Sequence, residues 1–290
     1  MELWFVLAIL VVVLWGSDGI FAKLSTPKLG VARIAILMAT VEVMMYFVGF
    51  YLWRSNVPLS LEIVLLAEIS CMIGMIGYLC YFESISDGQI AIVGTISAGY
   101  PALTVIGAIA FLSETLSVAQ IFAVVAIIGG VIALSYEPNP GSQHAISKRS
   151  VFFALLAFGF WGIWSLTSKM AISMIGAGNI FGLYVISSLT IPPLYASFRK
   201  LRPRQDSNDN PSSRAWAFGA IALALNVCGI FALSLALESG FASLVFTISS
   251  AYPLVTVILA VGLLHEKLNK LHVIALVFVI LGLIGIGTIG

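Results

Sequence analysis

The sequence TISAGYPALTVIGAIAFLSETLS at Thr95–Ser117 occurs a second time, with changes, as TISSAYPLVTVILAVGLLHEKLN at Thr247–Asn269. The two segments are identical at twelve of 23 positions. The shared positions include a Tyr-Pro pair and a glutamate near the end of each segment. Chance similarity between two apolar segments does not readily produce both features. We therefore infer that the chain contains an internal repeat.

The repeat extends beyond this pair of segments. Trp15-Gly16 aligns with Trp161-Gly162 at an offset of 146 residues. The offset is 152 for the Tyr-Pro segments, and a longer loop in the second copy accounts for the difference. The sequence therefore predicts two copies of one unit, residues 1–136 and 151–290, joined by a linker at residues 137–150.

The composition excludes an ordinary soluble domain. Hydrophobic residues make up 60% of the chain, charged residues make up 9%, and the mean hydropathy is +1.09. A soluble domain carries roughly 25% charged residues. The net charge of +1 provides no basic surface for nucleic acid. We therefore expect an integral membrane protein.

The apolar residues form continuous runs rather than alternating with polar ones. A helix needs roughly 20 apolar residues to cross about 30 Å of hydrocarbon. The predicted fold is all-α, with ten transmembrane helices at about 3–22, 31–53, 63–82, 89–112, 118–135, 151–171, 180–198, 215–237, 241–264 and 272–289.

The number of helices in each copy predicts how the copies are related. Each copy holds five helices, so the second copy must enter the membrane from the opposite side. The prediction is two inverted five-helix repeats, related by a pseudo-two-fold axis in the membrane plane.

Lys and Arg are distributed unevenly between the predicted loops. The even-numbered loops contain only Arg54 and Lys169, whereas the odd-numbered loops contain the other twelve. Because positive residues favour the cytoplasmic side, we expect the odd-numbered loops in the cytoplasm and both termini outside. The protein is expected to be a multi-pass protein of the cell membrane, meaning the plasma or inner membrane.

Several motifs resemble a known family. WGSDGIFAK at residues 15–23, its echo WGIWSLTSK at 161–169, and the two Tyr-Pro helices resemble the EamA-like proteins of the drug/metabolite transporter (DMT) superfamily. The resemblance covers the whole chain. It implies secondary-active transport of amino acids and related metabolites by alternating access, without ATP. Ten-helix relatives often have cytoplasmic termini, whereas the charge distribution here indicates the reverse.

We therefore expect an exporter of amino acids or related small polar or amine metabolites. Two alternatives remain open. One alternative is a non-transporting accessory membrane subunit with a dry interior, and the other is a flippase for lipid headgroups.

Three carboxylic acids lie within predicted helices, namely Asp18, Glu42 and Glu68. A charge inside a membrane helix costs on the order of a few kcal/mol, so such residues are candidates for function. All three acids lie in the first copy only, because their repeat counterparts are Trp164, Ser188 and Ala220. We expect them to bind a cationic group of the substrate, or a proton that acts as the coupling ion.

A purely structural role is the alternative for two of the three acids. Asp18 has Lys23 and Arg33 as candidate ion-pair partners near the end of its helix. Glu68 has an alternative role as a polar contact between helices. Glu42 has no obvious basic partner at its depth.

Aromatic residues form a second set of candidates. Aromatic faces hold apolar side chains and attract ammonium groups. Trp15 and Asp18 are three residues apart, so they share a helix face. Packing against lipid is the alternative, and Trp4 and Trp53, at helix ends, are expected in an interfacial belt. The aromatic residues predicted to bind substrate are Trp15, Tyr78, Tyr81, Tyr100, Trp161, Trp164 and Tyr252.

Pro101 and Pro253 are predicted to lie within helices, where proline removes a backbone hydrogen bond and kinks the chain. The two kinks are candidate hinges, with a static change of shape as the alternative. Carbonyl groups freed by the kinks, together with Ser97 and Ser249, are expected to contact substrate. Asn226 either bonds a neighbouring helix or contacts substrate.

Glu114 and Glu266 end two matched helices. Each is followed three residues later by a good N-cap for the next helix, Ser117 or Asn269. We interpret both glutamates mainly as parts of turns.

No pattern indicates an enzyme. The three cysteines, Cys71, Cys80 and Cys228, show no metal-ligand spacing, and neither a Walker A motif nor a nucleophile–base arrangement appears. We expect no cofactor and no metal. The expected partners are a small-molecule substrate, the lipid bilayer and a proton. Because one chain contains both copies, either a monomer or a homodimer is compatible with a transport pathway.

Overall fold

The computed structural model describes residues 2–87, 96–135, 147–201, 211–264 and 270–289. Their regular structure is helical, because each backbone polar group in lipid must be satisfied within its own segment. The first half contains α1 (Leu3–Leu29), α2 (Val31–Trp53), α3 (Leu61–Asp87), α5 (Tyr100–Phe111) and α6 (Val118–Ser135). The second half contains α7 (Lys148–Ile175), α8 (Ala177–Leu201), α9 (Ser213–Ser239), α10 (Ala242–Ser249), α11 (Tyr252–Leu264) and α12 (Lys270–Ile289).

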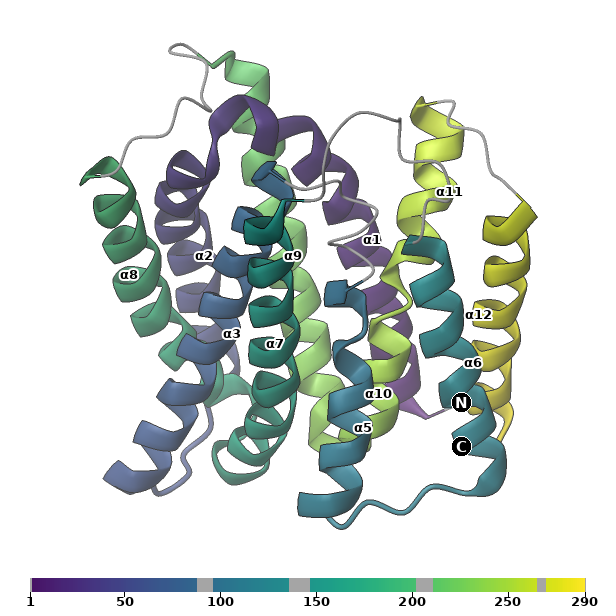
Figure 1. Cartoon of the computed structure of the whole chain (residues 1–290). Helices are drawn as coiled ribbons and strands as arrows, with labels where there is room; N and C mark the ends of the chain where they lie inside the picture. The colour runs from purple at the N-terminus through teal and green to yellow at the C-terminus, as the bar shows by residue number, and fades with distance from the viewer. Residues whose placement is uncertain (1, 88–95, 136–146, 202–210, 265–269, 290) are drawn as a thin grey trace.

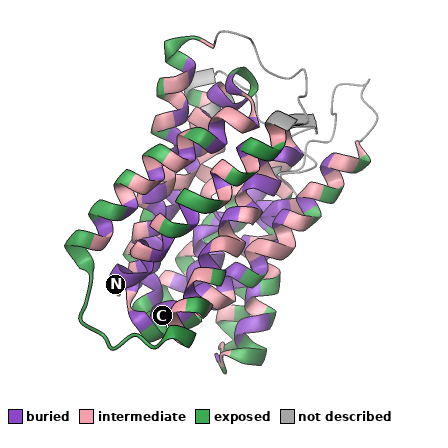
Figure 2. Cartoon of the chain, turned by 90° about the vertical axis from the view of Figure 1, so that its left-hand side faces the viewer, coloured by how far each residue is buried: buried purple, intermediate pink, exposed green. Residues whose placement is uncertain are grey.

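The helices have the length and composition of membrane spans. Within the described residues, eight helices are long and apolar enough to cross a bilayer. Two shorter apolar helices cover Ile96–Phe111 and Val118–Leu134. Many large hydrophobic side chains, including Met44, Phe111 and Leu194, are at least 70% exposed. Figure 2 shows exposed residues along the outward faces of the helices. These surfaces are suited to lipid, so the prediction of a multi-pass membrane protein is confirmed.

The helices stand side by side in one bundle (Figure 1). The start of α1 and the end of α12 lie at the same end of the bundle, at the bottom of the view. The end of α1, the end of α8 and the starts of α9 and α12 lie at the opposite end, which we call the upper end. The upper end carries basic residues that include Lys28, Arg199, Arg214 and Lys270.

The two halves do not form separate bodies. The most extensive contact of α1 is with α9, and the most extensive contact of α3 is with α7. In the same way, α2 packs on α8 and α6 packs on α12. Each of these pairs joins one half to the other. If each helix is replaced by its counterpart in the other half, the α1–α9 pair becomes the α7–α3 pair, and the other two pairs are unchanged.

Two glycines make the matching turns between the first two helices of each half. Gly30 separates α1 from α2 with a φ of 73°, and Gly176 separates α7 from α8 with a φ of 80°. These positive φ values are unfavourable for residues that carry a Cβ atom. The two glycines are 146 residues apart, the offset that aligns Trp15-Gly16 with its copy.

The Tyr-Pro pairs lie at interruptions of their helices. Pro101 is the second residue of α5, directly after the turn at Gly99. Pro253 is the second residue of α11, which Ser250 and Ala251 separate from α10. Proline is well suited to the first turn of a helix, where no helical partner exists for its missing N–H group. Both prolines therefore begin a helical segment rather than bend the middle of one.

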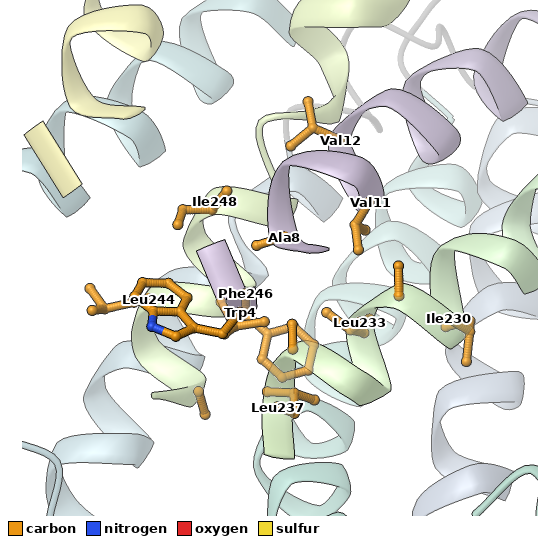
Figure 3. Close-up of a cluster of buried hydrophobic side chains, with 14 of the residues drawn as sticks. Trp4, Ala8, Val11, Val12, Ile230, Leu233, Leu237, Leu244, Phe246 and Ile248 are labelled. Carbon is orange, nitrogen blue, oxygen red and sulfur yellow. The ribbon is translucent and has the colours of Figure 1, made fainter. Parts of the chain in front are cut away.

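The prediction for Trp4 is wrong. Its side chain is only 7% exposed and lies in the core, packed edge-on against Phe5. Figure 3 shows Trp4 beside Leu244, among side chains of α1, α9 and α10. The approach of α10 to the start of α1 covers this residue, and a sequence pattern does not reveal that contact. Trp53 is 49% exposed, as expected of a residue at a membrane interface.

Candidate functional site

Asp18 and Glu42 form the polar centre of the candidate site. Asp18 of α1 is 8% exposed, and Glu42, at the midpoint of α2, is 2% exposed. The two carboxyl groups are close enough to interact electrostatically. Ser188 of α8 donates a hydrogen bond of 3.0 Å to Glu42 Oε2, and the side chain of Asn226 on α9 lies near Asp18. These contacts bring together two acids that are distant in sequence.

Asn226 lies where α9 meets α1. Its side chain is near Asp18, and its backbone carbonyl accepts a hydrogen bond of 3.3 Å from Trp15 Nε1. The side chain of Lys23 lies outside the described part of the structure.

Glu68 lies apart from the two central acids. It is partly exposed on α3, and its Oε1 accepts a hydrogen bond of 2.7 Å from Ser187 of α8. Nearby, Ser70 Oγ and Thr167 Oγ1 are 2.8 Å apart across the contact between α3 and α7. Glu68 therefore belongs to a polar seam between α3, α7 and α8.

The predicted aromatic residues contact one another across the helices. Trp15 packs edge-on against Tyr252, with ring centroids 6.2 Å apart. Trp161 packs in a similar way against Tyr100, with ring centroids 5.8 Å apart. The ring centroids of Tyr81 and Trp161 are 5.4 Å apart. Three of the tyrosines, namely Tyr78, Tyr81 and Tyr252, are near enough to Asp18 to interact with its charge.

Trp164 differs from the other tryptophans of the set. Its side chain is 6% exposed, and its Nε1 donates a hydrogen bond of 2.9 Å to the hydroxyl of Tyr184. Tyr184 in turn stacks on Tyr46 with ring centroids 4.8 Å apart. The structure therefore places Trp164 in the packed wall behind the site.

Small residues receive two of the tryptophan rings. A Cβ atom on Gly229 of α9 would lie 2.3 Å from Trp15 Nε1, and one on Gly77 of α3 would lie 2.8 Å from Trp161 Cδ1. Gly77 and Gly229 are 152 residues apart, the second offset of the repeat. Each tryptophan therefore lies against a glycine of the opposite half.

Several buried polar atoms of the candidate residues have no protein partner among the described residues. They are Asp18 Oδ1, Glu68 Oε2, Ser97 Oγ, Tyr100 OH and Ser249 Oγ. Such groups are costly to bury without a hydrogen bond. Ser97 and Ser249 are at most 1% exposed, and each lies three residues before a Tyr-Pro segment. These atoms remain available to bind a polar ligand or water.

Glu114 has a role that the sequence pattern did not reveal. It is 6% exposed, and it accepts hydrogen bonds from the backbone of Ala242 at 2.6 Å and of Ser243 at 3.0 Å. The hydroxyl of Ser243 donates a third bond, of 2.5 Å. Glu114 therefore caps α10, in the opposite half, rather than only shaping its own turn.

The interpretation of Ser117 as an N-cap is confirmed. Its Oγ accepts a hydrogen bond of 3.2 Å from the backbone of Gln120, and its own backbone N–H donates to Gln120 Oε1 at 2.9 Å. The matched residues Glu266 and Asn269 lie outside the described residues.

Lys169 complements Glu114 at the same turn. Its Nζ donates hydrogen bonds of 2.6 Å and 2.9 Å to the carbonyl groups of Leu237 and Gly240, at the end of α9. A cation at the end of one helix and an anion at the start of the next both interact favourably with the helix dipoles. The repeat pairs Lys169 with Lys23 and Glu114 with Glu266, and it gives no indication that Lys169 and Glu114 meet at one turn.

An ion-pair cluster lies near the upper end of the bundle. The carboxylate of Glu83 on α3 is paired with Arg149 at 2.5 Å and with Arg199 at 2.7 Å. Tyr195 also donates a hydrogen bond to Glu83. The cluster connects α3 with α7 and α8. Glu83 lies beyond the region that the sequence reading treated as membrane-embedded, and for this reason it was missed.

Metal ligands do not gather in the part of the chain that the structure describes, where no group of three His, Cys, Asp or Glu side chains has suitable geometry. The polar centre consists instead of isolated carboxyl groups, hydroxyl groups and aromatic rings. This arrangement can bind a cation or exchange protons.

Comparisons with known proteins address the family and the fold. The model of the EamA-like transporter family matches residues 2–136 and again residues 148–288. An uncharacterised protein of Methanocaldococcus jannaschii, MJ1333.1, is 31% identical over 130 residues, which cover 45% of this chain and 94% of that protein. A solved structure, described as the crystal structure of a protein, has a TM-score of 0.78 at 14% identity and covers 99% of both chains. This last likeness shows a shared fold.

Proposed function

The chain belongs to the EamA-like transporter family of the DMT superfamily, and from this premise we propose that it exports amino acids or related small amines by secondary-active transport. Membership of the family makes the chain a membrane transporter. The proposed substrate class rests on the chemistry of the site, and the proposed direction rests on the resemblance to exporters.

The buried pair of Asp18 and Glu42 is the observation that carries the proposal. The ion pairs of the described residues join Glu83 to Arg149 and Arg199 rather than involving Asp18 or Glu42. A substrate ammonium group or a proton would balance their charge. Trp15 and Tyr252 lie beside them and offer aromatic faces to the rest of an amine.

Alternating access requires two related halves around one site, and we propose ten helices in two inverted five-helix repeats. The family model matches twice, and MJ1333.1 matches less than half of this chain over nearly its own whole length. The paired helices, the matched glycine turns and the matched tryptophan–glycine contacts support the same symmetry. Rocking of the halves, with the Pro101 and Pro253 segments as hinges, would expose the site to each side in turn.

We also propose that the upper end of the bundle faces the cytoplasm, with both termini outside. The basic residues at this end support that orientation. A single chain supplies both halves, so the proposed pathway needs no second copy.

The proposal is tested by uptake of a labelled pool of amino acids and amines into proteoliposomes, with and without a pH gradient. The unmodified protein is compared with Glu42→Gln, and Glu62→Gln serves as a control because Glu62 is exposed at the start of α3. We expect saturable uptake of a few compounds, lost in Glu42→Gln and retained in the control.

Other outcomes have distinct meanings. Saturable uptake that neither Glu42→Gln nor the gradient alters would retain the transporter and remove Glu42 from the mechanism. If no compound moves while the protein remains folded, the accessory-subunit and headgroup-flippase alternatives are favoured instead.

A further inference from the structure

Two consecutive serines on α8 contact two different intramembrane acids. Ser187 donates to Glu68 on α3, and Ser188 donates to Glu42 on α2, at 2.7 Å and 3.0 Å respectively. Consecutive residues of a helix point about 100° apart, because the helix has 3.6 residues per turn. α8 therefore presents one hydroxyl group to each neighbouring helix and links the two carboxyl groups through adjacent residues.

The two acids differ in how far their side chains are exposed. Glu42 has eleven residues of α2 on either side and is 2% exposed. Glu68 is partly exposed and lies seven residues from the start of α3, or about 10 Å at 1.5 Å per residue. The two serines are fully buried. The link therefore runs from a partly exposed carboxyl group to a buried one.

The surroundings of both acids contain groups that can carry protons. Glu68 faces Ser187 and interacts electrostatically with Cys71. Its Oε2 atom has no hydrogen-bond partner among the described residues. Glu42 faces Ser188 and interacts electrostatically with four further groups, namely Asp18, Tyr46, Tyr78 and Tyr184.

We propose that Glu68 is the group through which protons enter and that the α8 serine pair connects it to Glu42. This inference rests on the proposed function, to which it adds a proton as the coupling ion and a route for that proton. Glu68 acts as a relay group, and Glu42 acts at the site itself.

The transfer conserves every atom. A proton from water binds the Glu68 carboxylate. Protonated Glu68 then donates to the Ser187 oxygen, so the Ser187 hydroxyl hydrogen turns from Glu68 toward a bridging water molecule. Ser187 accepts the proton from Glu68 and releases its own hydroxyl hydrogen to that water. The water passes a proton to Ser188 in the same manner, and Ser188 delivers one to the Glu42 carboxylate. Only O–H bonds form and break, and Glu68 returns to its carboxylate form.

The test follows the protonation of Glu42 directly and needs no substrate. The purified protein, in lipid nanodiscs, is subjected to a rapid pH jump, and the carboxyl band that disappears in Glu42→Gln is followed by time-resolved infrared spectroscopy. In Glu68→Gln we expect this band to respond more slowly by roughly a hundredfold, the scale on which a positioned proton-transfer group acts. The final amplitude of the band should be unchanged.

Two further variants isolate the route. Ser187→Ala removes the hydroxyl and retains both acids, so it should slow the response as Glu68→Gln does. Glu62→Gln, on the same helix but exposed, should respond as the unmodified protein does. Circular dichroism verifies the fold of each variant.

An unchanged rate in both Glu68→Gln and Ser187→Ala would overturn the proposal, as would the absence of any Glu42 band that responds to pH. Neither result would alter the uptake of substrate by the unmodified protein, so failure of this inference is distinguishable from failure of the proposed function.

Discussion

Glu114 illustrates how a single buried carboxylate joins the two halves of the molecule. It belongs to the first half, yet its three short hydrogen bonds all come from the first residues of α10. The first N–H groups of a helix have no partner within the helix itself. Since α10 begins in the protein interior, an acceptor from another part of the chain has to satisfy them.

Replacing Glu114 should therefore destabilise the protein. Glu114→Ala leaves buried donors without an acceptor, which costs about 1–3 kcal/mol. We expect a lower Tm in detergent, with a smaller decrease for Glu114→Gln because the amide oxygen still accepts a hydrogen bond. Glu62→Ala, at an exposed position, is the matched control. Equal Tm values for Glu114→Ala and this control would show that the cap does not contribute to stability.

At the scale of the elements, the contact between α1 and α9 depends on the absence of a side chain at Gly229. The indole of Trp15 occupies the place where a Cβ atom would lie, and α7 and α3 repeat the arrangement with Trp161 and Gly77. Trp15 also bonds the backbone of α9, which fixes the orientation of its ring beside Tyr252. The packing of these helix pairs therefore sets the geometry of the aromatic part of the site.

Gly229→Val should abolish substrate transport, because its side chain would force Trp15 away from its position. Gly77→Val should act in the same way on Trp161. Gly129→Val is the control, since nothing among the described atoms lies within 4 Å of a Cβ atom there. Uptake into proteoliposomes and intrinsic tryptophan fluorescence measure the effect. Normal uptake by Gly229→Val would show that the position of Trp15 is not needed for transport.

At the scale of the whole molecule, the orientation in the membrane follows from the grouping of basic residues at one end. Cysteine labelling in intact cells tests this orientation. Ser60 lies in the exposed connection between α2 and α3, and Lys148 lies at the exposed start of α7 at the other end. Cys71 and Cys80 are buried, and the unmodified protein gives the background from Cys228.

We expect a membrane-impermeant maleimide to label Ser60→Cys in intact cells and Lys148→Cys only after the membrane is opened. This outcome corresponds to basic loops in the cytoplasm and termini outside. The opposite pattern would reverse the orientation and agree with the cytoplasmic termini of many ten-helix relatives.

The architecture also explains why the halves have no independent core. Each large helix contact joins the first half to the second, so the apolar faces of one half are covered by the other. Helices in a bilayer gain little from hydrophobic burial against each other and depend on close packing and hydrogen bonds. The glycine–tryptophan contacts and the Glu114 cap are interactions of this kind.

The sequence by itself determined the membrane environment, the approximate helix positions, the repeat and the family, because each depends on local composition or on direct similarity. It also identified Asp18 and Glu42 as unusual, since a carboxyl group in an apolar run is visible without coordinates. Only the tertiary structure brought Asp18, Glu42, Asn226 and Ser188 together, because these residues lie on different helices and come into contact only when the bundle packs. For the same reason it alone revealed the burial of Trp4, the cap at Glu114 and the serine link between Glu68 and Glu42.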